Sequence, residues 1–220
     1  MVFGKIRYLN LLPFHVFLKR RLRLSQQKAA LAYRKGVPAE INRQLDKRRI
    51  DAAVISSIKS FGYDCADMGI VAQNEVQSVY VIKGTHSKTD HESNTSNVLA
   101  AILGLEGEVL IGDKALKRYV DGVEMIDMGL EWKKRYGLPF VFARLCFCRH
   151  GRYYKKLSRA FLHRRVRIPQ YILRRRAKET GIPPRAILDY LTKISYDVGY
   201  REKRTLKIFR NEAKKRGLIP

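Results

Sequence analysis

The sequence is short of cysteine, of acidic residues and of long apolar runs, and each shortage excludes a class of protein. Its three cysteines, Cys65, Cys146 and Cys148, are too few and odd in number for a disulfide framework, so we expect reduced thiols. No run approaches the roughly 20 apolar residues of a transmembrane helix. Lys5 and Arg7 interrupt the first residues, where no apolar signal-peptide core follows. We therefore expect a cytoplasmic globular protein with no membrane association.

Familiar catalytic motifs are also missing. The chain has no Gly-x-x-x-x-Gly-Lys-Ser/Thr loop, no Gly-x-Gly-x-x-Gly after a strand and no Gly-x-Ser-x-Gly elbow. Cys146, Cys148 and His150 alternate and would share one face of a strand, but three ligands without a fourth form a weak metal motif. We expect neither a metal nor a cofactor.

Basic residues greatly outnumber acidic ones. The chain has 45 Lys and Arg against 20 Asp and Glu, a formal net charge of +25. Such a field attracts polyanions, which keeps an RNA-binding role open as an alternative. However, zinc-finger spacing, an aromatic RNP-type strand and a basic region followed by heptads are all absent. Solvated basic helix faces explain the charge as well, so we expect no specific nucleic-acid partner.

Apolar patterns predict strands that alternate with helices, which favours an α/β fold with a parallel sheet. Strands are predicted from Gly4 onward and at 51–57, 78–82, 108–111, 123–127 and 140–143. Helices are predicted at 15–24, 38–50, from 95 onward, and at 113–119, 130–136, 153–165, 168–180, 184–194 and 201–216.

The order of these elements predicts two lobes with a ligand cleft between them. Residues 1–80 and about 150–220 would form lobe I, and about 81–149 would form lobe II. The chain would cross between the lobes near 78–82 and again near 140–144. Ligand sites commonly lie between lobes of this kind.

Neutral polar residues lie at the predicted ends of strands and helices that would border this cleft. They are Asn10, Ser56, Ser57, Ser78, Thr95 and Ser96. A helix start such as Thr95–Ser96 offers free N–H groups and a positive dipole end to an anion. Simple helix capping by Asn10 or by the Thr95–Ser96 pair remains an alternative. Such a cleft suits a small carboxylate, bound either by a receptor or by an enzyme whose substrate is itself reactive.

Several blocks in register resemble a known enzyme family. They are 4–13 (GKIRYLNLLP), 36–38 (GVP), 50–57 (IDAAVISS), 93–96 (SNTS), 111–116 (IGDKAL), 127–132 (DMGLEW) and 137–143 (GLPFVFA). Together they resemble the chorismate dehydratases, which open the futalosine route to menaquinone. The last two blocks are the most specific.

The resemblance implies a two-lobed periplasmic-binding-protein type II fold in a cytoplasmic hydro-lyase. It implies that chorismate loses water to give 3-[(1-carboxyvinyl)oxy]benzoate, with the substrate's own enolpyruvyl carboxylate as base. In the family, the residues matching Asn10 and Ser78 are linked to catalysis. Thr95 and Ser96 would hold a carboxylate, with Ser56 and Ser57 nearby, from the expected geometry of the site.

Two related alternatives share the expected fold. One is the 1,4-dihydroxy-6-naphthoate synthase branch of the same pathway, and the other is a non-catalytic protein that binds a small carboxylate. The block at 127–143 favours the dehydratases over the first, and the missing signal peptide disfavours an exported binding protein. The sequence leaves the oligomeric state and the loop that closes the cleft open.

Overall fold

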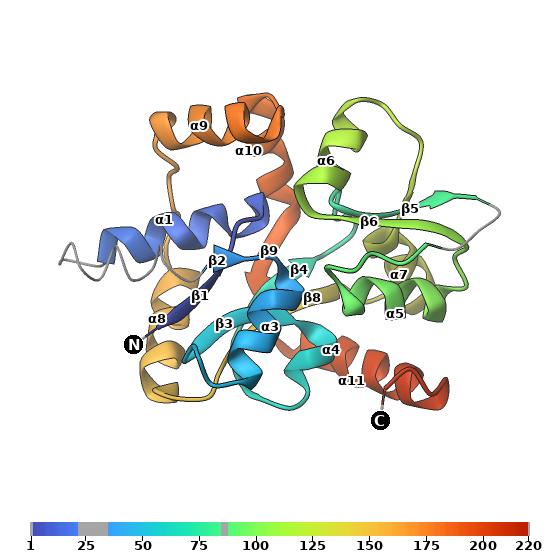
Figure 1. The fold of residues 1–220 in the computed structure, drawn as a ribbon, viewed down its shortest axis with the longest axis horizontal. Helices are drawn as coiled ribbons and strands as arrows, with labels where there is room; N and C mark the ends of the chain where they lie inside the picture. Colours follow the sequence, from blue (N-terminus) through green and yellow to red (C-terminus); the bar gives the residue numbers. More distant parts are fainter. Residues whose placement is uncertain (1, 22–34, 85–87, 220) are drawn as a thin grey trace.

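Two β-sheets of different size organise the chain in a computed structural model that describes residues 2–21, 35–84 and 88–219 (Figure 1). The larger sheet has the strand order β2-β1-β3-β8-β4-β9, and the smaller has the order β6-β5-β7. The larger contains β1 (Phe3–Ile6), β2 (Lys35–Gly36), β3 (Ala52–Ser56), β4 (Asp64–Ala72), β8 (Phe140–Phe147) and β9 (Ile194–Asp197). The smaller contains β5 (Val79–Lys83), β6 (Gly107–Ile111) and β7 (Ile126–Asp127).

Helices connect and cover both sheets, which confirms the α/β class predicted from the sequence (Figure 1). They are η1 (a 3-10 turn, Leu9–Leu11), α1 (Leu12–Arg21), α3 (Pro38–Asp46), α4 (Ser57–Ser60), α5 (Asn94–Leu103), α6 (Gly112–Val120), α7 (Met128–Tyr136), α8 (Gly151–Leu162), α9 (Gln170–Thr180), α10 (Pro184–Lys193) and α11 (Tyr200–Lys215). In the ranges that the structure describes, no helix has the length and apolarity needed to cross a membrane.

The parallel pairing predicted for the first strand–helix–strand unit is confirmed between β1 and β3, but it does not extend to the whole of the larger sheet. β1 runs parallel to β2 and β3, whereas β8 runs antiparallel to β3 and β4. The smaller sheet is antiparallel throughout its described pairings.

Three strands, β2, β4 and β9, are absent from the sequence-based prediction. β4 contains Asp64, Asp67 and Gly69, which interrupt its apolar pattern, and β9 is a four-residue strand within a region predicted to be helical. Both become strands by pairing with each other and, for β4, with β8. The predicted helix at 15–24 corresponds to α1, and its residues 22–24 lie outside the described residues.

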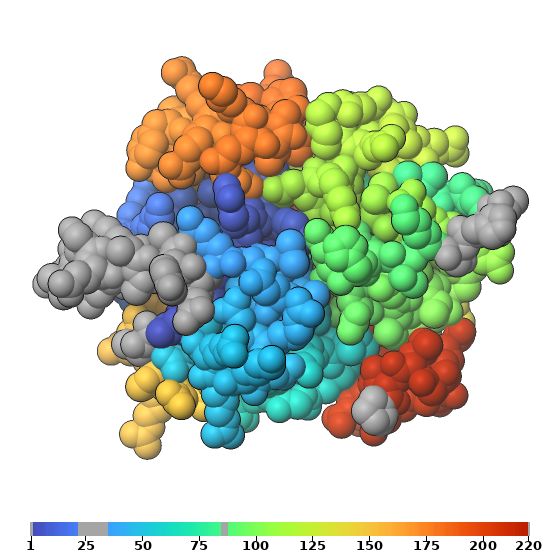
Figure 2. Space-filling view, in the orientation of Figure 1, coloured from blue at the N-terminus to red at the C-terminus, as the bar shows by residue number. Residues whose placement is uncertain are grey.

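The strand pairing of β8 is relevant to the predicted boundary between the two lobes. The sequence-based division assigns 140–149 to lobe II, whereas β8 pairs along its length with β3 and β4 of the larger sheet. We therefore propose that lobe II extends from about Ser78 to about Pro139. In the space-filling view its green surface meets the blue and cyan surface of the amino-terminal elements (Figure 2).

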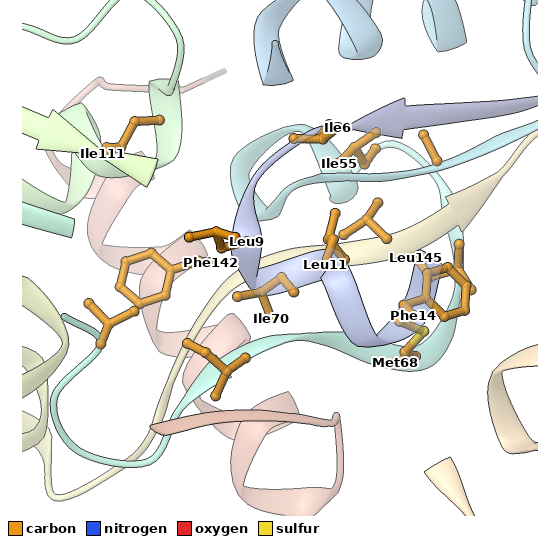
Figure 3. Close-up of a cluster of buried hydrophobic side chains, with 14 of the residues drawn as sticks. Ile6, Leu9, Leu11, Phe14, Ile55, Met68, Ile70, Ile111, Phe142 and Leu145 are labelled. Carbon is orange, nitrogen blue, oxygen red and sulfur yellow. The ribbon is translucent and has the colours of Figure 1, made fainter. Parts of the chain in front are cut away.

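The main apolar cluster extends through both sheets, and the part of it shown in Figure 3 includes the contact of η1 and α1 with the larger sheet. Phe14 is fully buried, and its ring meets that of Phe161 edge-on with centroids 5.1 Å apart. Leu9 and Leu11 are also buried, on either side of Asn10 in the chain. Because these two leucines are fixed in the core, the direction of the Asn10 side chain is fixed as well.

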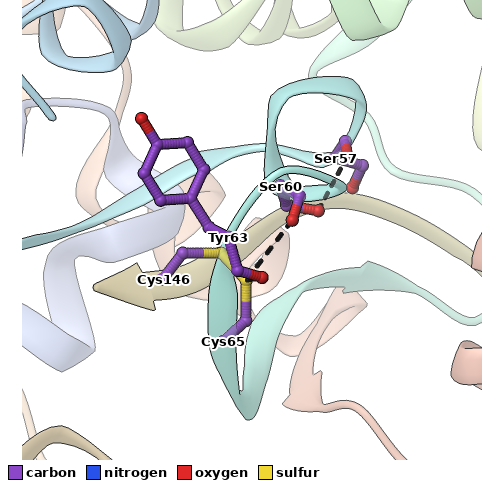
Figure 4. Close-up of a disulfide and its surroundings, with 5 residues drawn as sticks. All are labelled: Ser57, Ser60, Tyr63, Cys65 and Cys146. Carbon is purple, nitrogen blue, oxygen red and sulfur yellow. Dashed lines mark hydrogen bonds between the residues drawn. A yellow bond between two sulfur atoms is a disulfide. The ribbon is translucent and has the colours of Figure 1, made fainter. Parts of the chain in front are cut away.

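Cys65 and Cys146 form a disulfide, which corrects the expectation of three reduced thiols (Figure 4). They lie opposite each other on β4 and β8, with Cα atoms 3.9 Å apart and 81 residues apart in sequence. The third cysteine, Cys148, has a free thiol. The pairing escapes sequence analysis because it depends on β4, which the sequence pattern does not predict.

The thiol count tests this pairing directly. We expect one thiol per chain to react with an alkylating reagent in denaturant without reductant, and three after reduction, because Cys65 and Cys146 are bonded. Intact-mass spectrometry measures both counts. The Cys146→Ala variant is a control that cannot form the disulfide. Its number of alkylated thiols should be the same before and after reduction. Three alkylated thiols in the unreduced wild-type protein would contradict the bond.

Candidate functional site

A buried cavity lies between the two sheets, near the ends of β1, β3 and β6. Four of the six residues singled out from the sequence line it: Asn10, Ser56, Ser78 and Ser96. The other lining residues are Ile6, Tyr8, Leu11, Pro38, Val54, Ile70, Val79, Ser93, Ile111, Gly112, Phe142 and Ala143. Ile6, Leu11, Ile70, Ile111 and Phe142 form its apolar wall and belong to the buried cluster shown in Figure 3.

Asn10 reaches the cavity from the 3-10 turn that follows β1. The backbone of this turn is held on both sides: Leu9 N donates to Asp113 Oδ1 at 2.8 Å, and the Tyr196 hydroxyl donates to the Asn10 carbonyl at 2.6 Å. Tyr196 is half-buried, and burial raises its pKa well above the usual value, so it remains a donor. These contacts fix the backbone and leave the Asn10 amide available to the cavity.

Ser78 lies immediately before β5, where the chain passes from the larger sheet to the smaller one. Asp127, the N-cap of α7, accepts from Leu130 N at 3.0 Å and also from Gln77 N at 2.8 Å. The carboxylate therefore fixes the backbone that precedes Ser78. Gln77 has a positive φ of 56°, an unusual conformation for a residue other than glycine.

Tyr190 of α10 connects the two residues that the resemblance links to catalysis. Its hydroxyl donates to Ser78 Oγ at 2.9 Å and lies near the side chain of Asn10. Burial raises the pKa of Tyr190 above its usual value, so the phenol stays protonated. Because Ser78 Oγ accepts from Tyr190, its own O–H can donate into the cavity. Sequence analysis did not find Tyr190, which lies 112 residues from Ser78 on an ordinary amphipathic helix.

Three further hydroxyls border the cavity. Ser56 Oγ accepts from Asn42 Nδ2 at 3.1 Å, which leaves its O–H free to donate. Ser93 is the N-cap of α5: its Oγ accepts from Ser96 N at 3.2 Å and lies 3.0 Å from Ser96 Oγ. Capping of this helix is therefore done by Ser93, a residue that the sequence analysis did not single out, while Ser96 lines the cavity.

Ser57 and Thr95 do not line this cavity. Ser57 begins α4, where the strand alternation stops, and its hydroxyl donates to the Val141 carbonyl at 2.5 Å. Thr95 faces α4, and its Oγ1 accepts from Ile58 N at 3.1 Å. Both side chains hold neighbouring elements together, and neither is among the residues that line this cavity.

Tyr8 also lines the cavity. Its hydroxyl donates to a carboxylate oxygen of Glu92, and burial, followed by that carboxylate, raises the pKa of Tyr8. The ring packs against Gly112, which has a φ of +69°. A Cβ on Gly112 would lie 2.6 Å from Tyr8 Cζ, so only glycine fits beneath this ring.

Three helices of nine or more residues begin at the cavity. α3 starts at Pro38, α5 starts after Ser93, and α6 starts at Gly112, and all three of these residues line the cavity. Their positive dipole ends and free N–H groups favour an anion, although none of the described lining residues is itself charged. Within the described residues, no cluster of His, Cys, Asp and Glu could hold a metal ion. The site can therefore bind carboxylates through neutral donors.

Comparison with known proteins places this geometry in a family. A family model described as menaquinone biosynthesis matches residues 1–107 and 99–215. A chorismate dehydratase of Campylobacter jejuni subsp. jejuni is 43% identical over 213 residues, which cover 95% of this chain and 96% of that protein. A chorismate dehydratase of Thermus thermophilus is 26% identical over 260 residues, covering 94% and 93%.

Solved structures share the two-sheet arrangement at low sequence identity. An Archaeoglobus fulgidus protein aligns with a TM-score of 0.71 at 12% identity, covering 99% of this chain and 97% of that chain. The alkanesulfonate-binding protein SsuA of Xanthomonas axonopodis pv. citri aligns with a TM-score of 0.55 at 14% identity, covering 100% and 94%. These likenesses concern the fold, while the full-length sequence matches define the family. The chain belongs to the chorismate dehydratase family of menaquinone biosynthesis and has the fold of the periplasmic binding proteins.

Proposed function

We propose that this protein dehydrates chorismate to 3-[(1-carboxyvinyl)oxy]benzoate, as a carbon–oxygen lyase of the futalosine route in the cytoplasm. The observation that carries the proposal is that Asn10 and Ser78 line one cavity, where the Tyr190 hydroxyl donates to Ser78 Oγ. These are the two positions that the family resemblance links to catalysis. The near-complete alignment with a chorismate dehydratase at 43% identity supports it.

The proposed reaction needs little chemical assistance from the protein. The bond between a ring carbon and its hydrogen breaks, the electron pair forms the third ring double bond, and the neighbouring hydroxyl leaves with a proton as water. The enolpyruvyl carboxylate of the substrate takes the ring proton and passes it to the departing hydroxyl, so the water that leaves carries that same proton and the carboxylate is regenerated. Because the product ring is aromatic, the driving force lies in the substrate, and the protein contributes orientation and hydrogen bonds.

Asn10 and Ser78 would hold the enolpyruvyl carboxylate in position to take that proton. The Asn10 amide and the Ser78 O–H are neutral donors, so they orient the carboxylate without the strong ion pair that would lower its basicity. Tyr190 keeps both side chains in place. No metal or cofactor takes part in the proposed step.

The ring carboxylate would be bound by the hydroxyls on the other side of the cavity. Ser56 has a free O–H, and Ser93 and Ser96 lie at the positive end of α5. The apolar wall that contains Ile70, Ile111 and Phe142 would cover the ring. In this proposal the two carboxylates of chorismate would be bound by separate groups of donors.

Incubation of the purified protein with chorismate tests the proposal. We expect chorismate to disappear and an aromatic enol ether, lighter by one water, to accumulate with many turnovers per protein molecule. Liquid chromatography with mass detection follows both species, and a protein-free sample gives the background. Recovery of unchanged chorismate at saturating protein would favour a binding protein and overturn the assignment. Activity on a cyclic futalosine instead would place the chain in the naphthoate synthase branch.

A further inference from the structure

A second cavity, of about 220 Å³, lies on the other side of Tyr8 from the proposed substrate site. It is enclosed by β1, α1, β2 and α9, and Figure 1 shows α9 lying above α1. Tyr8 is the one residue that lines both cavities in the described part of the chain. The lining residues are Lys5, Arg7, Tyr8, Leu12, His15, Val16, Lys19, Lys35, Ile172, Arg175, Arg176 and Glu179.

The charge of this lining is strongly one-sided. Six of its side chains are Lys or Arg, and Glu179 is the one carboxylate. Glu179 is shared by three guanidiniums: Arg7 at 3.2 Å, Arg175 at 3.8 Å, and Arg176. Arg176 also pairs with Asp113 at 2.9 Å.

The three lysines of the cavity, in contrast, have no ion-pair partner in the described part of the chain. They are Lys5, Lys19 and Lys35. Residues 22–34, which join α1 to β2 in sequence, contain no Asp or Glu that could neutralise them. The lining therefore carries an uncompensated positive charge.

Two of the lysines lie directly opposite each other. Lys5 of β1 and Lys35 of β2 are paired in the register of the two parallel strands. Like charges at such positions destabilise a sheet. Burial, and then the charges of Lys19, Lys35, Arg7 and Arg176, lower the pKa of Lys5 to about 8. The folded protein thus keeps cations together at a cost in free energy, which a bound anion would remove.

His15 provides a second, independent indication of a ligand. It is 5% exposed and lines the cavity, and its Nε2 has no hydrogen-bond partner among the described residues. A buried polar atom without a partner costs roughly 1–3 kcal/mol. Burial, followed by the charges of Lys5 and Arg176, lowers the pKa of His15 well below its usual value, so the ring is neutral. A neutral imidazole can donate one N–H to an oxyanion.

We propose that this cavity binds a compact polyanion that carries phosphate groups or clustered carboxylates. Lys5, Lys19, Lys35 and Arg175 would bind its oxygens, and His15 Nε2 would donate to one of them. At roughly 30 Å³ for each water, the volume equals about seven water molecules, enough for a diphosphate or a tricarboxylate. The site lies outside the proposed substrate cavity and does not depend on the proposed function.

Calorimetric titration of the full chain with pyrophosphate and with citrate tests the proposal. We expect one molecule of at least one of them to bind per chain in the presence of physiological salt, and to remain bound when chorismate is added. The pyrophosphate and citrate arms distinguish a phosphate-bearing ligand from a carboxylate one. Failure of both to bind would overturn the proposal, and so would displacement by chorismate, which would place the anion in the first cavity.

A double variant, Lys19→Met with Lys35→Met, tests the location. We expect it to weaken binding at least tenfold and, without ligand, to melt at or above the wild-type temperature because like charges are removed. The matched control, Lys178→Met with Lys207→Met, removes the same charge from exposed positions outside the cavity. We expect it to weaken binding less than twofold. An equal loss of anion affinity in the two double variants would mean that the anion responds only to the overall positive charge of the protein, which would overturn the proposed location.

The pH dependence of sulfate binding provides a separate readout, because the charge of sulfate is constant near neutrality. Lys5 is protonated at pH 7 and neutral at pH 9.5, since its pKa is about 8. The neutral forms of Tyr8 and His15 persist over this range. We expect sulfate affinity to fall as the pH rises and the fall to be much smaller in Lys5→Met. An unchanged pH profile in this variant would count against the site.

Discussion

Replacing Asn10 with alanine is expected to lower the turnover number for chorismate at least a hundredfold. Loss of one preorganised hydrogen-bond donor commonly costs about 10²–10³ in turnover. The Asn10 side chain lines the cavity, while the fold at this point depends on buried Leu9 and Leu11 and on the backbone contact from Tyr196. We therefore expect a melting temperature close to that of the wild type.

Steady-state kinetics together with thermal melting separate a role in orientation from a role in capping. The exposed Asn74 offers a matched control, because Asn74→Ala removes the same amide from a position outside the cavity. We expect that variant to keep wild-type activity. If Asn10→Ala lost stability and activity in parallel, the residue would act through the helix that follows and not through the substrate.

The second large effect is expected at Gly112, where alanine should lower chorismate turnover more than tenfold. The φ of +69° strains any side chain, at a cost of about 1 kcal/mol, and the added Cβ would meet the Tyr8 ring at 2.6 Å. The ring would have to move into one of the two cavities that it separates. Gly112 N also donates to the Ser78 carbonyl at 2.8 Å. A displacement of the Gly112 backbone would therefore also displace Ser78.

Gly104 provides a control with nearly the same backbone conformation. Its φ is +70°, and a Cβ placed there would meet nothing within 4 Å. We expect Gly104→Ala to lose about 1 kcal/mol of unfolding free energy while keeping its activity. Denaturant unfolding and kinetic assays should be made on both variants. Gly104→Ala introduces backbone strain alone, whereas Gly112→Ala introduces the same strain and a contact with the Tyr8 ring. Equal activities in the two variants would show that the position of the Tyr8 ring does not matter for turnover.

The site shows which features local sequence patterns can predict. Asn10, Ser56, Ser78 and Ser96 lie next to predicted ends of strands or helices, and the structure brings these four to one cavity. Strand and helix ends are visible in sequence because periodicity stops there and turn or capping residues begin. In an α/β fold the carboxyl ends of neighbouring strands meet at one edge of the sheet, so residues at these ends are expected to line one cavity.

Neighbouring residues in these same motifs show the limit of such patterns. Ser57 follows Ser56, and Thr95 precedes Ser96, yet their side chains bind the Val141 carbonyl and the Ile58 amide. Which of two adjacent hydroxyls faces the cavity depends on where α4 begins and on how α5 is rotated. Composition and spacing do not contain that information.

Sequence patterns alone established the α/β class and the family, because these depend on periodicity and on motifs of adjacent residues. Only the folded chain shows that Tyr190 joins Ser78 to Asn10, that Cys65 is bonded to Cys146, and that cations from four elements surround one cavity. These contacts join residues separated by tens to more than a hundred positions. They arise from the packing of whole elements, which no local pattern specifies.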